Sequence, residues 1–121
     1  MATPIQIIKK DFGDVNHFTF IGAIDESNAD ETFKSIFNQF IGSQLIFDLG
    51  LLAYGNSKFI GYLSKMYEYV EEKNGQMYIV NCIEPIRDIL DICGILAIIP
   101  NTMSLNEALI NMGEKEEVST K

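Results

Sequence analysis

The sequence contains few of the residues that build a metal centre, a disulfide framework or a membrane span. Among its 121 residues are one histidine, two cysteines, three prolines and no tryptophan. No group of histidine, cysteine or acidic residues has the spacing of metal ligands. Cys82 and Cys93 both fall in apolar patterns, so we predict two buried thiols in a reducing compartment.

Long apolar stretches are missing as well. No run approaches the roughly 20 residues that a membrane-spanning helix needs. The first residues lack an apolar segment followed by a cleavage site, which a signal peptide would contain. We therefore expect a cytoplasmic protein that is not membrane-embedded.

Basic residues are scarce too. Nine lysines and arginines stand against seventeen acidic residues, for a formal net charge of −8. Nucleic acids and anionic lipids are bound by clustered basic side chains, so we expect neither as a partner. A protein partner with a basic surface fits this charge better.

Enzymatic motifs are also lacking. Gly50, Gly55 and Gly61 do not have either of the glycine spacings found in nucleotide-binding loops. His17 has no neighbour that suggests a catalytic triad, and we expect it to face solvent from a strand. We therefore predict no catalytic residue, no cofactor and no metal ion.

The apolar residues that are present follow the periods of strands and helices. Hydrophobic residues make up 47% of the chain, which is enough for one core in one domain. Residues 5–7 and 17–21 alternate as strands of a hairpin. Helical spacing then begins near residues 28, 57, 85 and 104, and short apolar runs at 45–49, 76–81 and 97–99 indicate strands. This order predicts an α/β domain with a mixed, mostly parallel sheet of about five strands and about four helices.

Cap residues mark several helix ends. Ser27 or Asn28 can cap the first helix, and Gly94 is placed to end the third. Ser104 and Glu107 have the spacing of a capping box at the start of the last helix.

Asp48 stands at the end of a short apolar strand, where a phospho-acceptor aspartate of a receiver domain would lie. Such domains also have an acidic pair after the first strand, and here that strand ends in two lysines, Lys9 and Lys10. The metal site of a receiver is therefore missing. We expect Asp48 to have a structural role, such as capping a neighbouring loop.

A polar pair, Asn56 and Ser57, marks the point where an expected loop over residues 50–56 meets the second long helix. Either side chain can cap that helix. The order of strand, Asp-Leu-Gly, apolar loop and Ser at a helix start resembles the STAS domain of sulphate transporters and anti-sigma factor antagonists. The segments at residues 22–25, 74–79, 90–95 and 107–109 resemble further STAS motifs. The resemblance extends over residues 5–112.

The resemblance implies a STAS domain over residues 1–113, followed by a polar tail at 114–121. It also implies an anti-sigma factor antagonist, a regulatory protein that binds an anti-sigma factor with serine kinase activity and frees a sigma factor. Ser57 matches the phosphorylated serine of that family, and Asp25, Asn56, Ser57 and Lys58 are the expected partner-binding residues. Asn56 and Phe59 replace the family's usual Asp and Gly.

Two other functions are consistent with the same sequence. A STAS subunit of a transporter complex, bound to a membrane-associated ATPase, needs the domain's shape without its phosphorylation. A small molecule or nucleotide in the loop pocket near Ser57 is a third hypothesis, because Gly50 and Gly55 would let a ligand approach the backbone.

Overall fold

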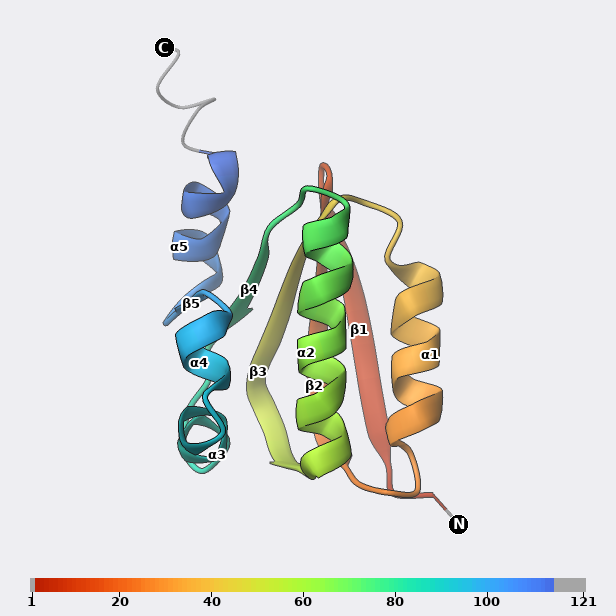
Figure 1. Cartoon of the computed structure of the whole chain (residues 1–121). Helices are drawn as coiled ribbons and strands as arrows, with labels where there is room; N and C mark the ends of the chain where they lie inside the picture. The colour runs from red at the N-terminus through yellow and green to blue at the C-terminus, as the bar shows by residue number, and fades with distance from the viewer. Residues whose placement is uncertain (1, 115–121) are drawn as a thin grey trace.

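The computed structural model describes residues 2–114, and all of the expected tail at 114–121 except its first residue lies outside them. The chain forms strands and helices in alternation after an initial hairpin (Figure 1). The strands are β1 (Ile5–Phe12), β2 (Val15–Ile24), β3 (Gln44–Gly55), β4 (Met77–Val80) and β5 (Asn101–Thr102). The helices are α1 (Ala29–Gln39), α2 (Ser57–Glu72), α3 (Ile86–Ile92), α4 (Ile95–Ile98) and α5 (Leu105–Leu109), which continues as a π-helical segment, η1 (Ile110–Glu114).

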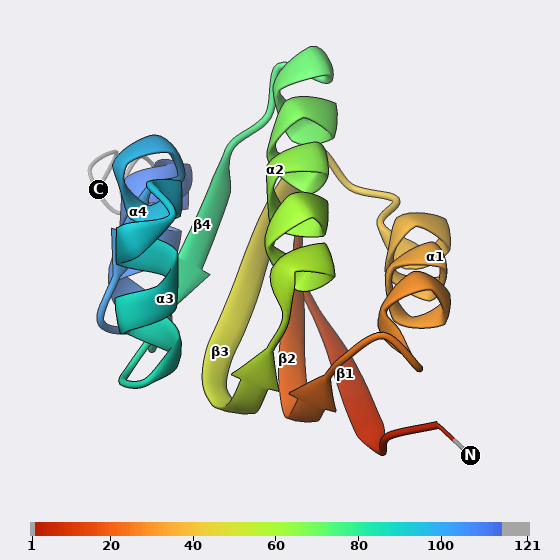
Figure 2. The same cartoon turned by 60° about the horizontal axis from the view of Figure 1, so that its bottom comes forward.

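The described strands form one sheet in the order β1-β2-β3-β4-β5. β1 is antiparallel to β2, and each later neighbouring pair is parallel. The predicted mixed, mostly parallel sheet is therefore confirmed, as is the α/β class. Helices α1 and α2 lie side by side over one face of the sheet, and α3, α4 and α5 lie beside β4 and β5 (Figures 1 and 2).

The main core lies between the sheet and helices α1 and α2, and phenylalanines fill its centre. The aromatic rings of Phe20 and Phe47 meet edge to face, with ring centroids 4.9 Å apart. Phe33 of α1 and Phe59 of α2 close over them and have exposed fractions of 0% and 1%. Full burial of such a side chain stabilises the fold by roughly 1.5–3 kcal/mol. A smaller apolar cluster, which includes Ala108 of α5, covers part of the other face.

Strands β2 and β3 are longer than the sequence indicates. The expected loop at residues 50–56 is wrong, because β3 continues to Gly55 and pairs with β2 as far as Ile24. Two register shifts place extra β3 residues in this stretch, so the regular alternation that predicts a strand is broken there. Gly22 lies inside β2 at φ 125°, where the sequence suggested a break.

The expected last strand at residues 97–99 is also wrong. Gly94 ends α3 in a left-handed conformation, as predicted, but the chain then starts a new short helix. The Ile99 amide donates to the Ile95 carbonyl at 2.8 Å, which closes one turn of α4. The fifth strand is Asn101–Thr102. Short apolar runs do not distinguish a strand from a helical turn by periodicity alone.

Two burial predictions are reversed by tertiary packing. His17 has an exposed fraction of only 7%, although it was expected to face solvent. It lies on the sheet face opposite α1 and α2, where Phe12 packs near its ring. Cys93 is exposed at the end of α3, whereas Cys82 is buried as predicted. Within residues 2–114, no helix has the length and apolar character needed to cross a membrane.

Candidate functional site

The predicted site residues lie where β2 and β3 end, at one edge of the parallel part of the sheet (Figure 2). The carboxyl ends of parallel strands are the usual place for sites in α/β folds. The backbone amide of Asn56 donates to the Ile24 carbonyl at 3.2 Å, so the start of α2 is tied to the end of β2. Asp25 follows Ile24 directly. The structure therefore brings Asp25 and Asn56, which are 31 positions apart, to neighbouring segments.

Asn56, and not Ser57, caps helix α2. The Asn56 side-chain oxygen accepts a hydrogen bond from the Phe59 amide at 3.0 Å. Ser57 is the first helical residue and its side chain is exposed, with no hydrogen bond to its hydroxyl among residues 2–114. The sequence left open which residue caps the helix. Because Asn56 takes that role, the Ser57 hydroxyl is available to a partner.

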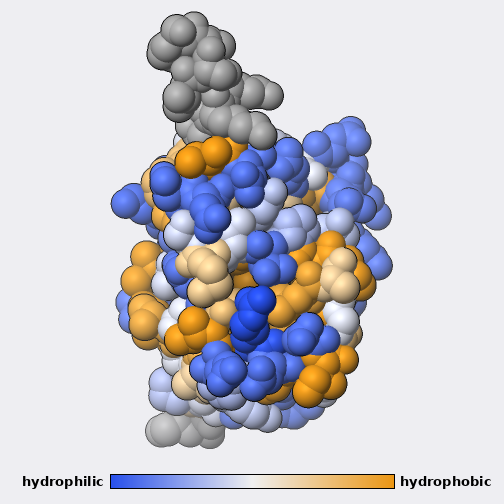
Figure 3. All heavy atoms as spheres, turned by 90° about the vertical axis from the view of Figure 1, so that its left-hand side faces the viewer, coloured by the Kyte–Doolittle hydropathy of each residue, from blue (hydrophilic) through white to orange (hydrophobic). Residues whose placement is uncertain are grey.

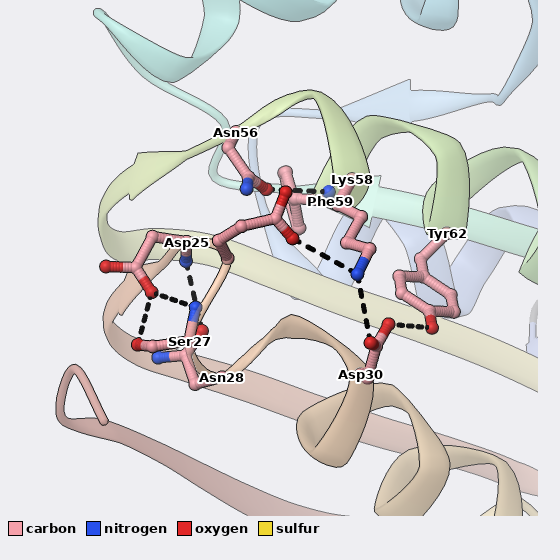
Figure 4. Close-up of polar contacts among 9 residues, drawn as sticks. Asp25, Ser27, Asn28, Asp30, Asn56, Lys58, Phe59 and Tyr62 are labelled. Atoms are coloured by element: carbon pink, nitrogen blue, oxygen red, sulfur yellow. Dashed lines mark hydrogen bonds and ion pairs between the residues drawn. The ribbon is translucent and has the colours of Figure 1, made fainter. Parts of the chain in front are cut away.

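Asp25 is held inside its own loop by short-range hydrogen bonds (Figure 4). Its carboxylate accepts from the Ser27 amide at 2.9 Å and the Ser27 hydroxyl at 2.6 Å, and also from the Thr3 hydroxyl. The hydrogen bonds from Ser27 and Thr3 lower the pKa of Asp25. Asp25 is thus an ionised anchor of the β2–α1 loop.

The Asn28 side chain holds this loop in place through three hydrogen bonds. Its side-chain oxygen accepts from the Asp25 amide at 3.0 Å, and its side-chain nitrogen donates to the Ala23 and Thr3 carbonyls, each at 2.8 Å. Ser27 or Asn28 was expected to cap α1. Asn28 occupies the N-cap position, but its side chain bonds to the loop and not to the helix. It is buried, and its amide is fully used in shaping the loop.

Lys58 joins α2 to the β2–α1 loop and to the first turn of α1. Its ammonium lies 3.1 Å from the Glu26 carboxylate and 2.9 Å from the Asp30 carboxylate. The hydroxyl of Tyr62 donates to the other Asp30 oxygen at 2.5 Å, and the Tyr62 ring stacks on Phe33. Hydrogen bonds from Tyr62 and Lys58 lower the pKa of Asp30, and those to Asp30 and Glu26 raise the pKa of Lys58.

Lys58 could be singled out from the sequence as a site residue, but its neighbours Glu26, Asp30 and Tyr62 could not. No local pattern connects them, since Lys58 and Asp30 are 28 positions apart and come together only when the helices pack. Lys58 was expected to be a partner-binding residue. In the structure its charge is already matched by two carboxylates, so the surface around it keeps an acidic excess.

Asp48 has the structural role that we expected. One carboxylate oxygen accepts from the Gly50 amide and the other from the Asn81 side chain, both at 3.0 Å. His17 lies 3.6 Å from the same carboxylate, slightly beyond hydrogen-bond distance. Burial raises the pKa of Asp48, but the interactions with His17, Gly50 and Asn81 outweigh it and the pKa is lowered overall. Asp48 therefore anchors the segment that follows β4.

Gly50 and Gly55, which precede α2, lie where neighbouring atoms leave little room for a side chain. A side chain at Gly55 would collide with the Phe59 ring, and one at Gly50 would meet the Asn81 side chain at 3.1 Å. A small pocket of about 180 Å³ lies along α2 instead, lined by Lys58, Gly61, Tyr62 and Lys65. The fold itself thus explains Gly50 and Gly55. Among the described residues, no group of three or more His, Cys, Asp or Glu side chains is arranged to hold a metal ion.

Comparison with known proteins now identifies the family. The family model of the STAS domain matches residues 6–108. The chain belongs to the STAS domain family. No curated protein matches the chain in sequence.

Several solved structures share the fold at low sequence identity. An anti-sigma factor antagonist from Mycobacterium paratuberculosis has a TM-score of 0.81 at 21% identity, covering 94% of this chain and 100% of that one. The Bacillus cell fate determinant SpoIIAA in its phosphorylated form has a TM-score of 0.64 at 14% identity, covering 89% and 98%. The murine anion transporter solute carrier 26 family member A9 has a TM-score of 0.69 at 15% identity, covering 85% of this chain and 18% of that one.

Proposed function

We propose that this protein is an anti-sigma factor antagonist, a cytoplasmic regulatory binding protein and not an enzyme. In this proposal its surface around Asp25, Asn56, Ser57 and Lys58 binds an anti-sigma factor with serine kinase activity. Binding to the anti-sigma factor frees a sigma factor, and phosphorylation at Ser57 breaks the complex with the anti-sigma factor. The observation on which the proposal depends is the exposed Ser57 hydroxyl at the start of α2, next to an Asn56 cap that leaves it free.

The comparison structures support this reading. The alignment with the anti-sigma factor antagonist from Mycobacterium paratuberculosis covers 94% of this chain and 100% of that one. SpoIIAA has been solved in both unphosphorylated and phosphorylated forms, and both share this fold. Phosphorylation is therefore compatible with a domain of this shape.

The chemistry at Ser57 suits a switch that acts on binding. The kinase would transfer the γ-phosphoryl group of ATP to the Ser57 oxygen, with release of ADP and of the hydroxyl proton to a kinase base. The new phosphate adds about −1.5 to −2 charges at pH 7. The helix N-terminus favours a negative charge, so the fold should tolerate it. The cost arises at the partner's surface, which would have to accept a buried dianion.

The test is incubation with ATP and a candidate kinase-type anti-sigma factor from the same organism, followed by mass-spectrometric mapping of phosphate. We expect phosphate on Ser57 and none in Ser57→Ala. Ser64→Ala is the matched control, because Ser64 is also exposed on α2. We also expect Ser57→Asp to bind the partner more weakly. Phosphate absent from Ser57, together with unchanged binding by Ser57→Asp, would contradict the proposal.

A second function is favoured by one observation, the fold shared with the murine anion transporter. In that alternative the protein is a STAS subunit bound to a membrane-associated transport ATPase. Asn56 and Phe59 in place of the family's Asp and Gly fit a domain that keeps its shape without being switched. Co-purification from the native cell separates the two functions. A transport ATPase in the complex favours this alternative, and a kinase-type anti-sigma factor favours the first.

A further inference from the structure

The chain segment just before β1 lies against the loop between β2 and α1. β1 begins at Ile5, which is opposite Gly22 of β2. Ahead of it, the Pro4 carbonyl accepts a long hydrogen bond from the Ala23 amide at 3.5 Å. Gly22 has φ 125°, and a side chain there would collide with the Pro4 carbonyl oxygen, so the two chain segments pass very close to each other. Figures 1 and 2 show the N-terminal segment beside the β2–α1 loop, at the same end of the sheet.

Thr3 uses all of its polar groups on this loop. Its backbone amide donates to the Ser27 hydroxyl oxygen at 2.9 Å, and its side-chain hydroxyl donates to the Asp25 carboxylate. Its carbonyl accepts from the Asn28 side chain at 2.8 Å. The three partners are 22 to 25 positions away from Thr3 in the sequence. These hydrogen bonds therefore fix the position of the loop relative to the start of β1.

The Asp25 carboxylate divides its two oxygens between the loop and Thr3. Oδ1 accepts from the amide and the hydroxyl of Ser27, and Oδ2 accepts from the Thr3 hydroxyl. Among residues 2–114, Thr3 is the one side chain that donates to Oδ2. A loop whose carboxylate is bonded on both sides has fewer conformations open to it. Loss of the Thr3 hydroxyl would leave Oδ2 to water and remove one of these restraints.

The loop held in this way carries part of the proposed partner surface. Glu26 follows Asp25 directly, and its carboxylate lies 3.1 Å from the Lys58 ammonium. Lys58 in turn follows Ser57 at the start of α2. The position of the loop therefore determines where Glu26 and Lys58 lie beside Ser57. A loop that is fixed before binding loses less conformational freedom when a partner binds, which strengthens the complex.

We infer that Thr3 is a positioning residue for partner binding, because its hydrogen bonds hold the β2–α1 loop in the conformation that the partner recognises. This inference rests on the proposed function and deepens it, since it adds a residue from outside the predicted site. Thr3 acts through Asp25 and the loop and not by touching the partner. Asp25 then contributes to binding by holding the loop, since both of its carboxylate oxygens are already bonded.

Two substitutions at Thr3 test the loop in the full chain without a partner. Thr3→Val removes the hydroxyl at nearly the same size, and Thr3→Ser keeps it. The hydrogen bonds from Ser27 and Thr3 lower the pKa of Asp25, so in Thr3→Val we expect that pKa, followed by carbon-13 NMR of the carboxyl group, to rise toward 3.8. Amide exchange at Ser27 should become faster by roughly threefold or more, because that amide donates to Asp25. Thr3→Ser should restore both parent values.

Thr102→Val is the matched control. The Thr102 hydroxyl also donates one hydrogen bond, to the Ser104 carbonyl at 2.7 Å, and Thr102 is half-buried like Thr3. It belongs to β5, away from the N-terminal segment (Figure 1). Figure 3 shows that side of the molecule, where hydrophobic and hydrophilic side chains are intermixed. We expect no change at Asp25 in this variant.

Binding is then measured by calorimetry with a candidate kinase-type anti-sigma factor from the same organism. We expect Thr3→Val to bind roughly threefold to tenfold more weakly, because a smaller fraction of the protein has the loop in place. Thr3→Ser and Thr102→Val should bind as the parent does. The Tm of Thr3→Val should stay within about 3 °C of the parent's, since no core residue changes.

Several outcomes would overturn the inference. One is an unchanged pKa of Asp25 with unchanged exchange at Ser27 in Thr3→Val, and another is a loosened loop with unchanged binding. Equal weakening in Thr3→Ser or Thr102→Val would also contradict it, because the Thr3 hydroxyl would not be the cause. A larger fall in Tm would make the effect one of folding and overturn it too. If the parent itself fails to bind, the proposed function fails, and the two loop measurements alone decide whether Thr3 holds the loop.

Discussion

Replacing Asn56 by alanine should destabilise the domain, whereas replacing Ser57 by alanine should not. The Asn56 side chain satisfies the Phe59 amide at 3.0 Å, and Phe59 is 1% exposed in the main core. Loss of an N-cap of this kind costs about 1 kcal/mol. The backbone bond from Asn56 to Ile24 survives the substitution, so the loss should not exceed that of one cap. The Ser57 hydroxyl makes no such bond.

The assay is thermal and urea unfolding followed by circular dichroism. For a domain of this size, about 1 kcal/mol corresponds to a fall in Tm of about 3–5 °C. We expect that fall in Asn56→Ala, and a change within about 0.5 kcal/mol in Ser57→Ala. Asn56→Asp should match the parent or exceed it, because a carboxylate caps the helix and also meets its positive end.

The comparison between the two alanine variants shows whether Asn56 or Ser57 caps helix α2. If Ser57→Ala melted as low as Asn56→Ala, Ser57 would be the cap and its hydroxyl would not be free for a kinase. If neither variant changed the Tm, the cap would contribute nothing and the assignment of roles would be refuted.

Three further predictions concern packing, pH and thiol chemistry. Gly55→Ala should destabilise the fold by about 1–3 kcal/mol, because the added methyl overlaps a buried ring, whereas Gly61→Ala, which meets open space in α2, should stabilise it by about 0.5–1 kcal/mol in the same urea titration. The pKa of Asp48 is lowered from 3.8, so the ionised carboxylate stabilises the fold above that pH, and this stabilisation is lost as the pH falls through the lower pKa of the folded state. In an acid titration, Asp48→Asn should therefore lose stability less steeply than the parent, and an unchanged profile would contradict this. Cys93 is exposed, while burial raises the pKa of Cys82 to about 11, so iodoacetamide at pH 8 should label Cys93 first, and equal labelling rates would be contrary to the structure.

Some features could be predicted because the signal lies within a few residues. The capping box is one, since the Ser104 hydroxyl oxygen accepts from the Glu107 amide at 3.1 Å. Gly94 is another, because its left-handed conformation ends α3 where the apolar stripe stops. The strand at residues 97–99 failed for the opposite reason. A short apolar run has no decisive period, and the turn of α4 is set by what precedes and follows it.

The candidate site also has one part that could be predicted from the sequence and one part that could not. The segment from Asp48 to Gly61 could be recognised because its residue order and spacing are local, and that was enough to indicate the family and Ser57. The ion pairs of Lys58 with Glu26 of the β2–α1 loop and with Asp30 of α1 could not be foreseen, since a pattern along one helix does not tell which distant side chains pack against it.

Local order alone thus determines the α/β class, the sequence of helices and strands, and the position of Ser57 at a helix start. Three-dimensional packing decides that Asn56 caps the helix, that Lys58 is neutralised by two carboxylates, and that β3 continues past the end of β4. The physical reason is how far apart in the sequence the interacting residues lie. Periodicity and caps involve residues within about one helical turn, whereas ion pairs and strand ends depend on which distant segments the closed core brings together.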